Sequence, residues 1–184
     1  MRIIAGRFRG TKLAALGDGD AGAHLRPTSD RVRESLFSIL NGGRFGRPIE
    51  GARVLDLFAG TGALGLEALS RGASRVTFVE NGRKAQGLIH ENIAKCRVDS
   101  EVDLVMRDAT KLGQGEGHDL VFLDPPYGKG MGEKALAACL SGGWIAPGAI
   151  LVWEESAEIT PPKGVEILDK RRFGSTLITI LEAG

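Results

Sequence analysis

Short apolar runs alternate with amphipathic segments from Arg53 onward, and this alternation constrains the fold more than any other feature. Short runs rich in β-branched residues predict strands, whereas apolar positions at helical spacing predict helices. The strands are expected at residues 54–58, 75–80, 101–106, 120–123 and 149–154, and the helices between them at 62–71, 83–95 and 133–140. Strands that alternate with helices form a parallel sheet with helices on both faces. The sequence therefore predicts an α/β, doubly wound, Rossmann-like domain.

Two more β-prone runs lie near the end of the chain. They cover Val165–Leu168 and Leu177–Leu181, and Arg171-Arg172-Phe173-Gly174-Ser175 lies between them. Such a spacing is typical of two strands that pair antiparallel. With the five earlier strands they complete a predicted seven-stranded, mostly parallel sheet with an antiparallel C-terminal strand.

Charge is distributed unevenly along the chain, although its net value is only +1. Residues 1–47 hold nine Lys or Arg against four Asp or Glu, whereas residues 48–184 hold fifteen against nineteen. A basic segment on a near-neutral body raises the rate of encounter with a phosphate backbone. The alternative is a solvated segment without a partner. Pro27-Thr28-Ser29-Asp30 predicts a helix start in this segment, with Arg31 and Arg33 on its exposed face.

The cysteines and the apolar runs exclude several classes of protein. Cys96 and Cys139 are isolated, without a CxxC pair or a histidine cluster of metal-ligand spacing, so we expect reduced thiols and no metal. No stretch approaches the roughly 18 apolar residues that span a bilayer, and the first residues lack a secretion signal. We expect a soluble cytoplasmic protein with no membrane partner.

A glycine motif follows the first predicted strand. Gly60-Thr61-Gly62-Ala63-Leu64-Gly65 matches G-x-G-x-x-G between a strand and a helix, and Glu80 ends the second strand 20 residues after Gly60. A carboxylate there can accept hydrogen bonds from the ribose hydroxyls of NAD or of S-adenosylmethionine. These two features alone leave a dehydrogenase and a methyltransferase equally open.

Asp56, four residues before Gly60, separates the two cofactors. A pyrophosphate is anionic and is opposed by a nearby carboxylate, whereas S-adenosylmethionine carries an α-ammonium and a sulfonium. The segment 54–62 therefore resembles the first motif of class I methyltransferases. The alternative is a glycine turn needed only for close packing of strand and helix.

Arg107-Asp108-Ala109 follows the third strand and extends the predicted cofactor site. In the methyltransferase interpretation, the Asp108 carboxylate accepts from the adenine amine and the Ala109 amide donates to a ring nitrogen. The alternative for Asp108 is a turn cap. The residues expected to bind S-adenosylmethionine are Asp56, Phe58, Gly60, Thr61, Gly62, Glu80, Asn81, Asp108 and Ala109.

The most specific motif is Asp124-Pro125-Pro126-Tyr127, which follows the buried run 120–123. Parallel strands direct their carboxyl ends toward the ligand crevice, so this loop is expected to face the methyl donor. The Asp124 carboxylate and the Pro125 carbonyl can accept the two protons of a conjugated amine and orient its lone pair, while Tyr127 stacks on the base. The prolines fix the backbone and remove donors. A turn that only ends the strand is the alternative interpretation.

Several segments together resemble the RsmD family of bacterial 16S ribosomal RNA guanine-N2 methyltransferases. They are residues 2–10, residues 25–37, the glycine motif extended to Gly72, and the tetrapeptide at 124–127, so the resemblance covers nearly the whole chain. It implies that the target is a guanine in 16S ribosomal RNA or in a small-subunit assembly intermediate. The chain departs from the family pattern in its long glycine-rich loop at residues 17–23 and in Asn81-Gly82, which lies where the second ribose contact is expected.

In this interpretation residues 1–47 form a basic RNA-binding arm and helix, and residues 48–184 form the methyltransferase domain of a monomer. Arginine suits phosphate recognition because its planar fork donates two parallel hydrogen bonds. The residues expected to bind RNA are Arg7, Arg9, Arg26, Thr28, Arg31 and Arg33. Arg171 and Arg172 are candidates for the far side of the cleft, whereas Phe173 is expected in the core.

Other functions remain open at this point. One is an amino methyltransferase that acts on adenine in DNA or on a protein glutamine, because both offer a conjugated nitrogen to the same tetrapeptide. Another is a non-catalytic RNA-binding assembly factor, against which Asp56, Glu80 and Asp124 argue. A dehydrogenase is the third.

Overall fold

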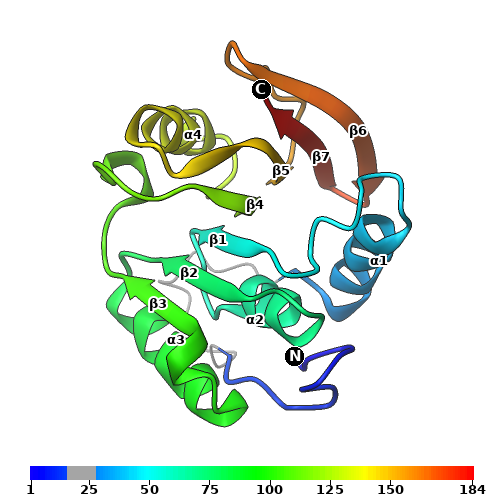
Figure 1. Cartoon of the computed structure of the whole chain (residues 1–184), viewed down its shortest axis with the longest axis vertical. Coiled ribbons are helices and arrows are strands. Elements are labelled where there is room, and N and C mark those ends of the chain that lie inside the picture. Colours follow the sequence, from blue (N-terminus) through cyan, green and yellow to red (C-terminus); the bar gives the residue numbers. More distant parts are fainter. Residues whose placement is uncertain (16–27) are drawn as a thin grey trace.

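The computed structural model describes residues 1–15 and 28–184. Across these residues, seven strands form one sheet in the order β3-β2-β1-β4-β5-β7-β6 (Figure 1). The strands are β1 (Arg53–Leu57), β2 (Arg75–Val79), β3 (Val102–Val105), β4 (His118–Leu123), β5 (Ile145–Glu155), β6 (Val165–Phe173) and β7 (Thr176–Ala183). Neighbouring strands from β3 to β5 are parallel, and β7 is antiparallel to both β5 and β6. The predicted mostly parallel sheet with an antiparallel C-terminal strand is confirmed.

Helices cover both faces of the sheet, as predicted. They are α1 (Asp30–Asn41), α2 (Ala63–Ser70), α3 (Arg83–Cys96) and α4 (Met131–Gly142), with short 3-10 turns η1 (Asp99–Glu101) and η2 (Ala109–Lys111). Buried residues of α1, α2 and α3 share one core with β1, β2, β4, β5 and β7, whereas α4 packs on the opposite face (Figure 1). No helix among the described residues has the length and apolar character needed to cross a membrane.

The last hairpin is longer and tighter than expected. Strand β6 continues through Arg171 and Arg172 to Phe173, so only Gly174 and Ser175 join it to β7. Gly174 has a φ of 61°, which a residue without a Cβ adopts without strain. Cross-strand pairing therefore extends over the segment predicted to be a connection. Its charged side chains remain exposed because β6 is an edge strand.

The N-terminal arm (residues 1–15) packs against α2 and is not separate from the core. It doubles back on itself, with Arg2 bridged to Lys12, and its Ile3 and Leu13 are buried in the core that α1 and α2 share. Gly6 allows the closest approach, because a Cβ there would lie 1.9 Å from the Ser70 carbonyl oxygen. Residues 1–15 and α1 therefore contribute to the same hydrophobic core as the sheet.

Candidate active site

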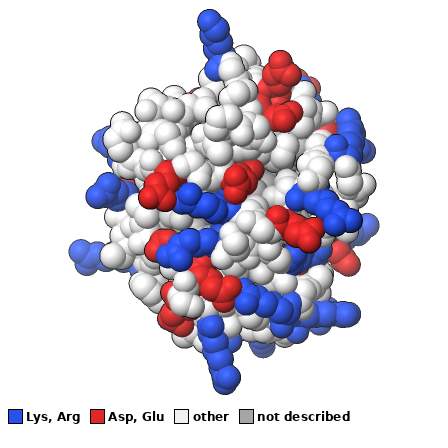
Figure 2. All heavy atoms as spheres, in the orientation of Figure 1, with Lys and Arg blue, Asp and Glu red and all other residues white. Residues whose placement is uncertain are grey.

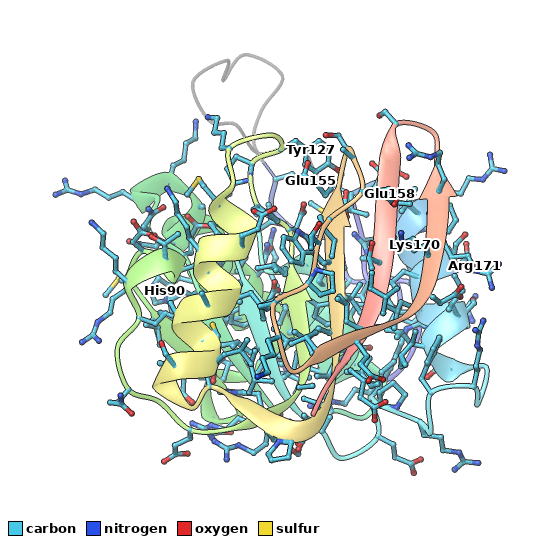
Figure 3. All side chains as sticks on the ribbon, turned by 90° about the horizontal axis from the view of Figure 1, so that it is seen from above. His90, Tyr127, Glu155, Glu158, Lys170 and Arg171 are labelled. Carbon is cyan, nitrogen blue, oxygen red and sulfur yellow. The ribbon has the colours of Figure 1, made fainter. Side chains whose placement is uncertain are left out.

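The carboxyl ends of β1, β2, β4 and β5 meet at one edge of the sheet because these strands are parallel. Four acidic residues lie at this edge: Asp56 in β1, Glu80 just after β2, Asp124 just after β4, and Glu154 near the end of β5. Figure 3 shows Tyr127 and Glu155 at this same end. Sequence analysis predicted the first three acids. It did not identify Glu154, although this acid ends the continuous buried run of β5 at residues 149–154, much as Asp124 follows the buried run of β4.

The glycine turn after β1 has a backbone that few residue types can adopt. Gly60 and Gly62 have φ of 60° and 77°, and Phe58 has a φ of 58° although it carries a side chain. A non-glycine residue in this region costs on the order of 1–3 kcal/mol and is common at ligand sites. Gly65 lets α2 approach the sheet, since a Cβ there would lie 2.5 Å from the Phe78 ring and 2.7 Å from Val76. The third glycine is therefore required for packing.

Glu80 ties the glycine turn to the end of β2. One carboxylate oxygen accepts from the Gly60 amide at 2.9 Å, and the other accepts from the Gly82 amide at 2.7 Å. Because each carboxylate oxygen can accept more than one hydrogen bond, further donors such as hydroxyls can be accommodated. Asn81 beside it is exposed. Thr61 is buried, and its carbonyl oxygen accepts from the Asn92 amide at 2.9 Å.

Asp56 is buried, and one of its oxygens accepts from the Gly65 amide at 2.9 Å. This bond fixes the first turn of α2 to β1. Burial raises the pKa of Asp56 to about 8, the Gly65 hydrogen bond opposes the rise, and the nearby charge of Glu80 adds to it. Asp56 is therefore largely the neutral acid at pH 7, and a cation bound next to it would favour its carboxylate form.

Asp108 has the cap geometry that was the alternative interpretation. One oxygen accepts from the Thr110 amide at 2.9 Å and from its hydroxyl at 2.7 Å at the start of η2. These hydrogen bonds lower the pKa of Asp108, so it is a carboxylate at neutral pH. A cap that uses one oxygen is compatible with adenine binding by the other. Ala109 beside it is buried.

The loop after β4 places Asp124 next to another acid. Asp124 is half-buried and Pro125 is buried. Burial and the nearby charges of Glu154 and Asp56 raise the pKa of Asp124 well above its usual range. No lysine or arginine among the described residues forms an ion pair with Asp124 or Glu154. An acid such as Asp124, with a raised pKa and no cationic partner among these residues, is characteristic of a functional site.

Glu154 organises the other side of the loop. Its side chain is buried, and it accepts from the Tyr127 hydroxyl at 2.7 Å and from the Thr28 hydroxyl at 3.0 Å. The Thr176 hydroxyl lies 3.1 Å from the Tyr127 oxygen. The Tyr127 ring is thus held by its hydroxyl at the end of β5, where sequence analysis expected only a stacking surface.

A cavity of about 280 Å³ lies beside Glu154. Its walls come from three parts of the chain: the start of α1, the end of β5 and the turn between β6 and β7. The lining residues are Thr28, Ser29, Val32, Glu154 and the segment Phe173-Gly174-Ser175-Thr176. Residue Phe173, expected in the core, lines this cavity and is partly buried against the core.

The described residues among those expected to bind RNA do not all lie at the same end of the sheet. Arg9 and Arg31 are exposed, and Thr28 lines the cavity. Arg7 is exposed but pairs with Glu101, which precedes β3 and lies at the opposite edge of the sheet from Asp124. Arg26 lies outside the described residues, as does the loop at residues 17–23.

The prediction for Arg33 is wrong. Its side chain is fully buried, it donates to the Arg2 carbonyl and to Asp30, and its Nε lies 3.8 Å from Glu67. The prediction grouped it with Arg31 on the face away from the apolar residues, but residues two apart on a helix point in different directions, and the N-terminal arm covers Arg33. Arg33 therefore contributes to the attachment of the arm and cannot contact RNA in this arrangement.

Cationic and acidic side chains alternate over the visible face, without one large basic patch (Figure 2). Arg171 lies on the outer side of β6, where it pairs with Asp169 (Figure 3). No group of three or more metal-ligating side chains is found among the described residues. The acids at the sheet edge are therefore the most distinctive chemistry in the described part of the chain.

Comparison with known proteins agrees with this architecture. The family described as "Conserved hypothetical protein 95" matches residues 1–182. Ribosomal RNA small subunit methyltransferase D of Haemophilus influenzae is 37% identical over 92% of this chain and 88% of its own length. The protein of the same name from Escherichia coli K12 is 38% identical over 86% and 76%, respectively. The chain belongs to the RsmD family.

Solved structures extend the RsmD-family likeness to the fold. The yhhF protein of Escherichia coli superposes with a TM-score of 0.85 at 34% identity, and the alignment covers 100% of this chain and 97% of that one. TrmN of Thermus thermophilus, at 23% identity and a TM-score of 0.64 over 83% of this chain and 48% of that one, shares the fold alone. The RsmD-family resemblance and the class I methyltransferase fold predicted from sequence are both confirmed.

Proposed function

We propose that this protein transfers a methyl group from S-adenosylmethionine to the exocyclic N2 amine of a guanine in small-subunit ribosomal RNA. The observation that carries the proposal is Asp124, a half-buried carboxyl group without a cationic partner among the described residues, at the end of β4. The names of the RsmD relatives from Haemophilus influenzae and Escherichia coli support the ribosomal RNA substrate.

The residues at the sheet edge fit S-adenosylmethionine. Asp56 and Glu80 offer acceptors for a cation and for ribose hydroxyls, and the free oxygen of Asp108 offers one for the adenine amine. The glycine turn leaves the backbone accessible because Gly60 and Gly62 carry no side chains. When bound, this cofactor supplies an electrophilic methyl group on a positively charged sulfur.

The segment Asp124-Pro125-Pro126-Tyr127, called the catalytic loop below, would activate the guanine amine by accepting hydrogen bonds from its protons. The N2 lone pair is delocalised into the ring, so hydrogen bonds from N2 to the Asp124 carboxylate and the Pro125 carbonyl favour a pyramidal, nucleophilic nitrogen. Methylation forms an N–C bond, breaks the donor C–S bond and releases one N2 proton. The pKa of Asp124 is raised, which makes its carboxylate a suitable acceptor for that proton. Tyr127, oriented by Glu154, would stack on the flipped base.

Contacts with the RNA backbone are proposed for the cationic residues that the structure leaves exposed. Arg31 lies on α1 one turn from Thr28, at the same end of the sheet as Asp124. Arg9 is exposed on the arm. Arg7 would contact RNA only at the amino-terminal end of the parallel strands, and only if its ion pair with Glu101 is broken.

The test is incubation of the protein with labelled cofactor and small-subunit ribosomal RNA, naked or in assembly intermediates, followed by mass spectrometry of the nucleosides. We expect N2-methylguanine. Asp124→Ala should lower kcat by about 10²–10³-fold or more, with cofactor affinity in calorimetry unchanged. Asp119→Asn, an exposed acid at the other end of β4, serves as the control and should retain activity. Label found only in adenine, DNA or protein would overturn the substrate.

A further inference from the structure

The buried carboxylate of Glu154, on β5, contacts the catalytic loop and lines the cavity. It accepts from Tyr127 of the loop, and it lines the cavity together with Thr28 and Thr176. The cavity volume of about 280 Å³ is close to the lower end of the range for small-molecule sites, about 300 Å³, as expected for one planar base. Asp124 does not line the cavity, but the pairing of Leu123 with Trp153 sets Asp124 beside Glu154, so a base that contacts Glu154 lies next to Asp124.

Glu154 also has unused acceptor capacity. Each of its oxygens accepts one hydrogen bond, from the hydroxyls of Tyr127 and Thr28, whereas a carboxylate offers about four acceptor sites. No described lysine or arginine neutralises it. Two hydroxyls hold the carboxylate in place without cancelling its charge, so a third donor, supplied by a ligand, would find a preorganised acceptor.

Guanine presents two adjacent donors on its Watson–Crick edge, the N1–H and the N2 amine. Adenine presents an acceptor at N1, which would face the Glu154 carboxylate and repel it. Asp124 on β4 and Glu154 on the neighbouring β5 are both acceptors, and both strands end at the same edge of the sheet. Adjacent acceptors therefore match adjacent donors of guanine and reject adenine.

We propose that Glu154 selects guanine by accepting a hydrogen bond from its N1–H, while Asp124 engages the neighbouring N2 amine. This inference rests on the proposed function, since it assigns the base recognition within the same site. Tyr127, Thr28 and Thr176 act as positioning residues for the selecting carboxylate. The proposal assigns base selection to Glu154 on β5 and amine activation to Asp124 just after β4.

The experiment compares ribosomal RNA fragments that carry guanine or 2-aminopurine at the mapped target position. 2-Aminopurine keeps the 2-amine but lacks the N1–H. For the unaltered protein, we expect kcat/KM to be about 10- to 100-fold lower with 2-aminopurine. Glu154→Gln should lose a similar factor with guanine and little more with 2-aminopurine. 2-Aminopurine also lacks the O6 acceptor, so its own loss does not identify the N1–H as the cause. The decisive result is therefore non-additivity: Glu154→Gln lowers kcat/KM with guanine but has little further effect with 2-aminopurine.

Glu155→Gln is the matched control. Glu155 follows Glu154 directly but is half-buried, and one of its oxygens accepts from Ser156. It should keep the full preference for guanine. If Glu154→Gln turns over too slowly, the same comparison is made by equilibrium RNA binding in the Asp124→Ala background, with circular dichroism to verify folding.

Two outcomes are distinguishable. If the unaltered protein methylates guanine but the losses from Glu154→Gln and 2-aminopurine multiply independently, the role of Glu154 is overturned and the proposed function stands. If no guanine is methylated in any ribosomal RNA substrate, the proposed function itself fails.

Discussion

The fully buried Glu67 and the pair formed by Asp124 and Glu154 have opposite surroundings. Glu67 of α2 is fully buried and accepts from the Ile4 amide at 2.8 Å, the Ala5 amide at 3.1 Å and the Arg71 guanidinium at 2.7 Å, with Arg33 beyond. Asp124 and Glu154 receive no guanidinium or ammonium from the described residues. The first acid is compensated within the protein, and the second group is left for a ligand.

The difference separates structure from function. A buried charge surrounded by donors and cations holds chain segments together, and here it attaches the N-terminal arm to α2. The nearby charge of Glu154 contributes to the raised pKa of Asp124, and such like-charge repulsion is unfavourable unless a ligand relieves it. A cationic cofactor and a base with two donors would relieve that repulsion. Four changes test this comparison.

The largest effect is expected from Glu67→Ala. Removal of Glu67 takes one of two acidic partners from the buried Arg33, leaving Asp30, and it deprives two arm amides of their acceptor, so the free energy of unfolding should fall by about 3–5 kcal/mol. Urea denaturation measures the loss. Glu50→Ala, which breaks the exposed pair with Arg47, should cost about 0–1 kcal/mol. Equal effects at both positions would contradict the structural role of Glu67.

Gly65→Ala tests the packing that presents an amide to Asp56. A Cβ would meet Phe78, Val76 and the Asp56 carboxylate, the last at 3.0 Å, so a loss of about 1–3 kcal/mol is expected. Gly87→Ala is the matched control, because Gly87 is an exposed position of α3 and a Cβ there would contact nothing within 4 Å. There alanine should stabilise by about 0.5–1 kcal/mol. Thermal unfolding that ranks the two variants the other way would refute the packing argument.

The raised pKa of Asp56 predicts a pH dependence of stability. Between about pH 4 and pH 8 the unfolded chain has released this proton while the folded protein still binds it. The free energy of unfolding should therefore fall as the pH rises through this window, by up to about 1.4 kcal/mol per pH unit from this group. Asp56→Asn should flatten the profile, whereas Glu166→Gln, at an exposed position, should not. An unchanged slope in Asp56→Asn would contradict the raised pKa of Asp56.

Tyr127→Phe should have the smallest effect. It keeps the ring but removes the hydroxyl that donates to Glu154, a hydrogen bond worth about 0.5–1.5 kcal/mol. We expect a roughly 2- to 10-fold lower kcat/KM for RNA with unchanged cofactor affinity. Tyr127→Leu, which also removes the ring, should be more severe. If both variants were equally impaired, the hydroxyl and not the ring would carry the function of Tyr127.

Local patterns predicted most elements but not their full extent. The run 120–123 predicted the last four residues of β4, yet the strand begins at His118. The ring nitrogens of His118 form hydrogen bonds with the Thr77 hydroxyl and the Trp144 carbonyl, each at 3.0 Å. A polar residue breaks the apolar pattern, and only its partners on other segments make it part of the strand. The same reason explains β6, where pairing with β7 carries the strand through Arg171 and Arg172.

The sequence by itself determined the α/β alternation, the glycine turn and the placement of Asp124, because spacing along the chain encodes these features. Only the tertiary structure decided that Arg33 faces inward and that Thr28 and Glu154, 126 residues apart, share a hydrogen bond. The exposure of a side chain depends on which segment packs over it. Contacts between distant residues depend on strand order, which the periodicity of one segment does not specify.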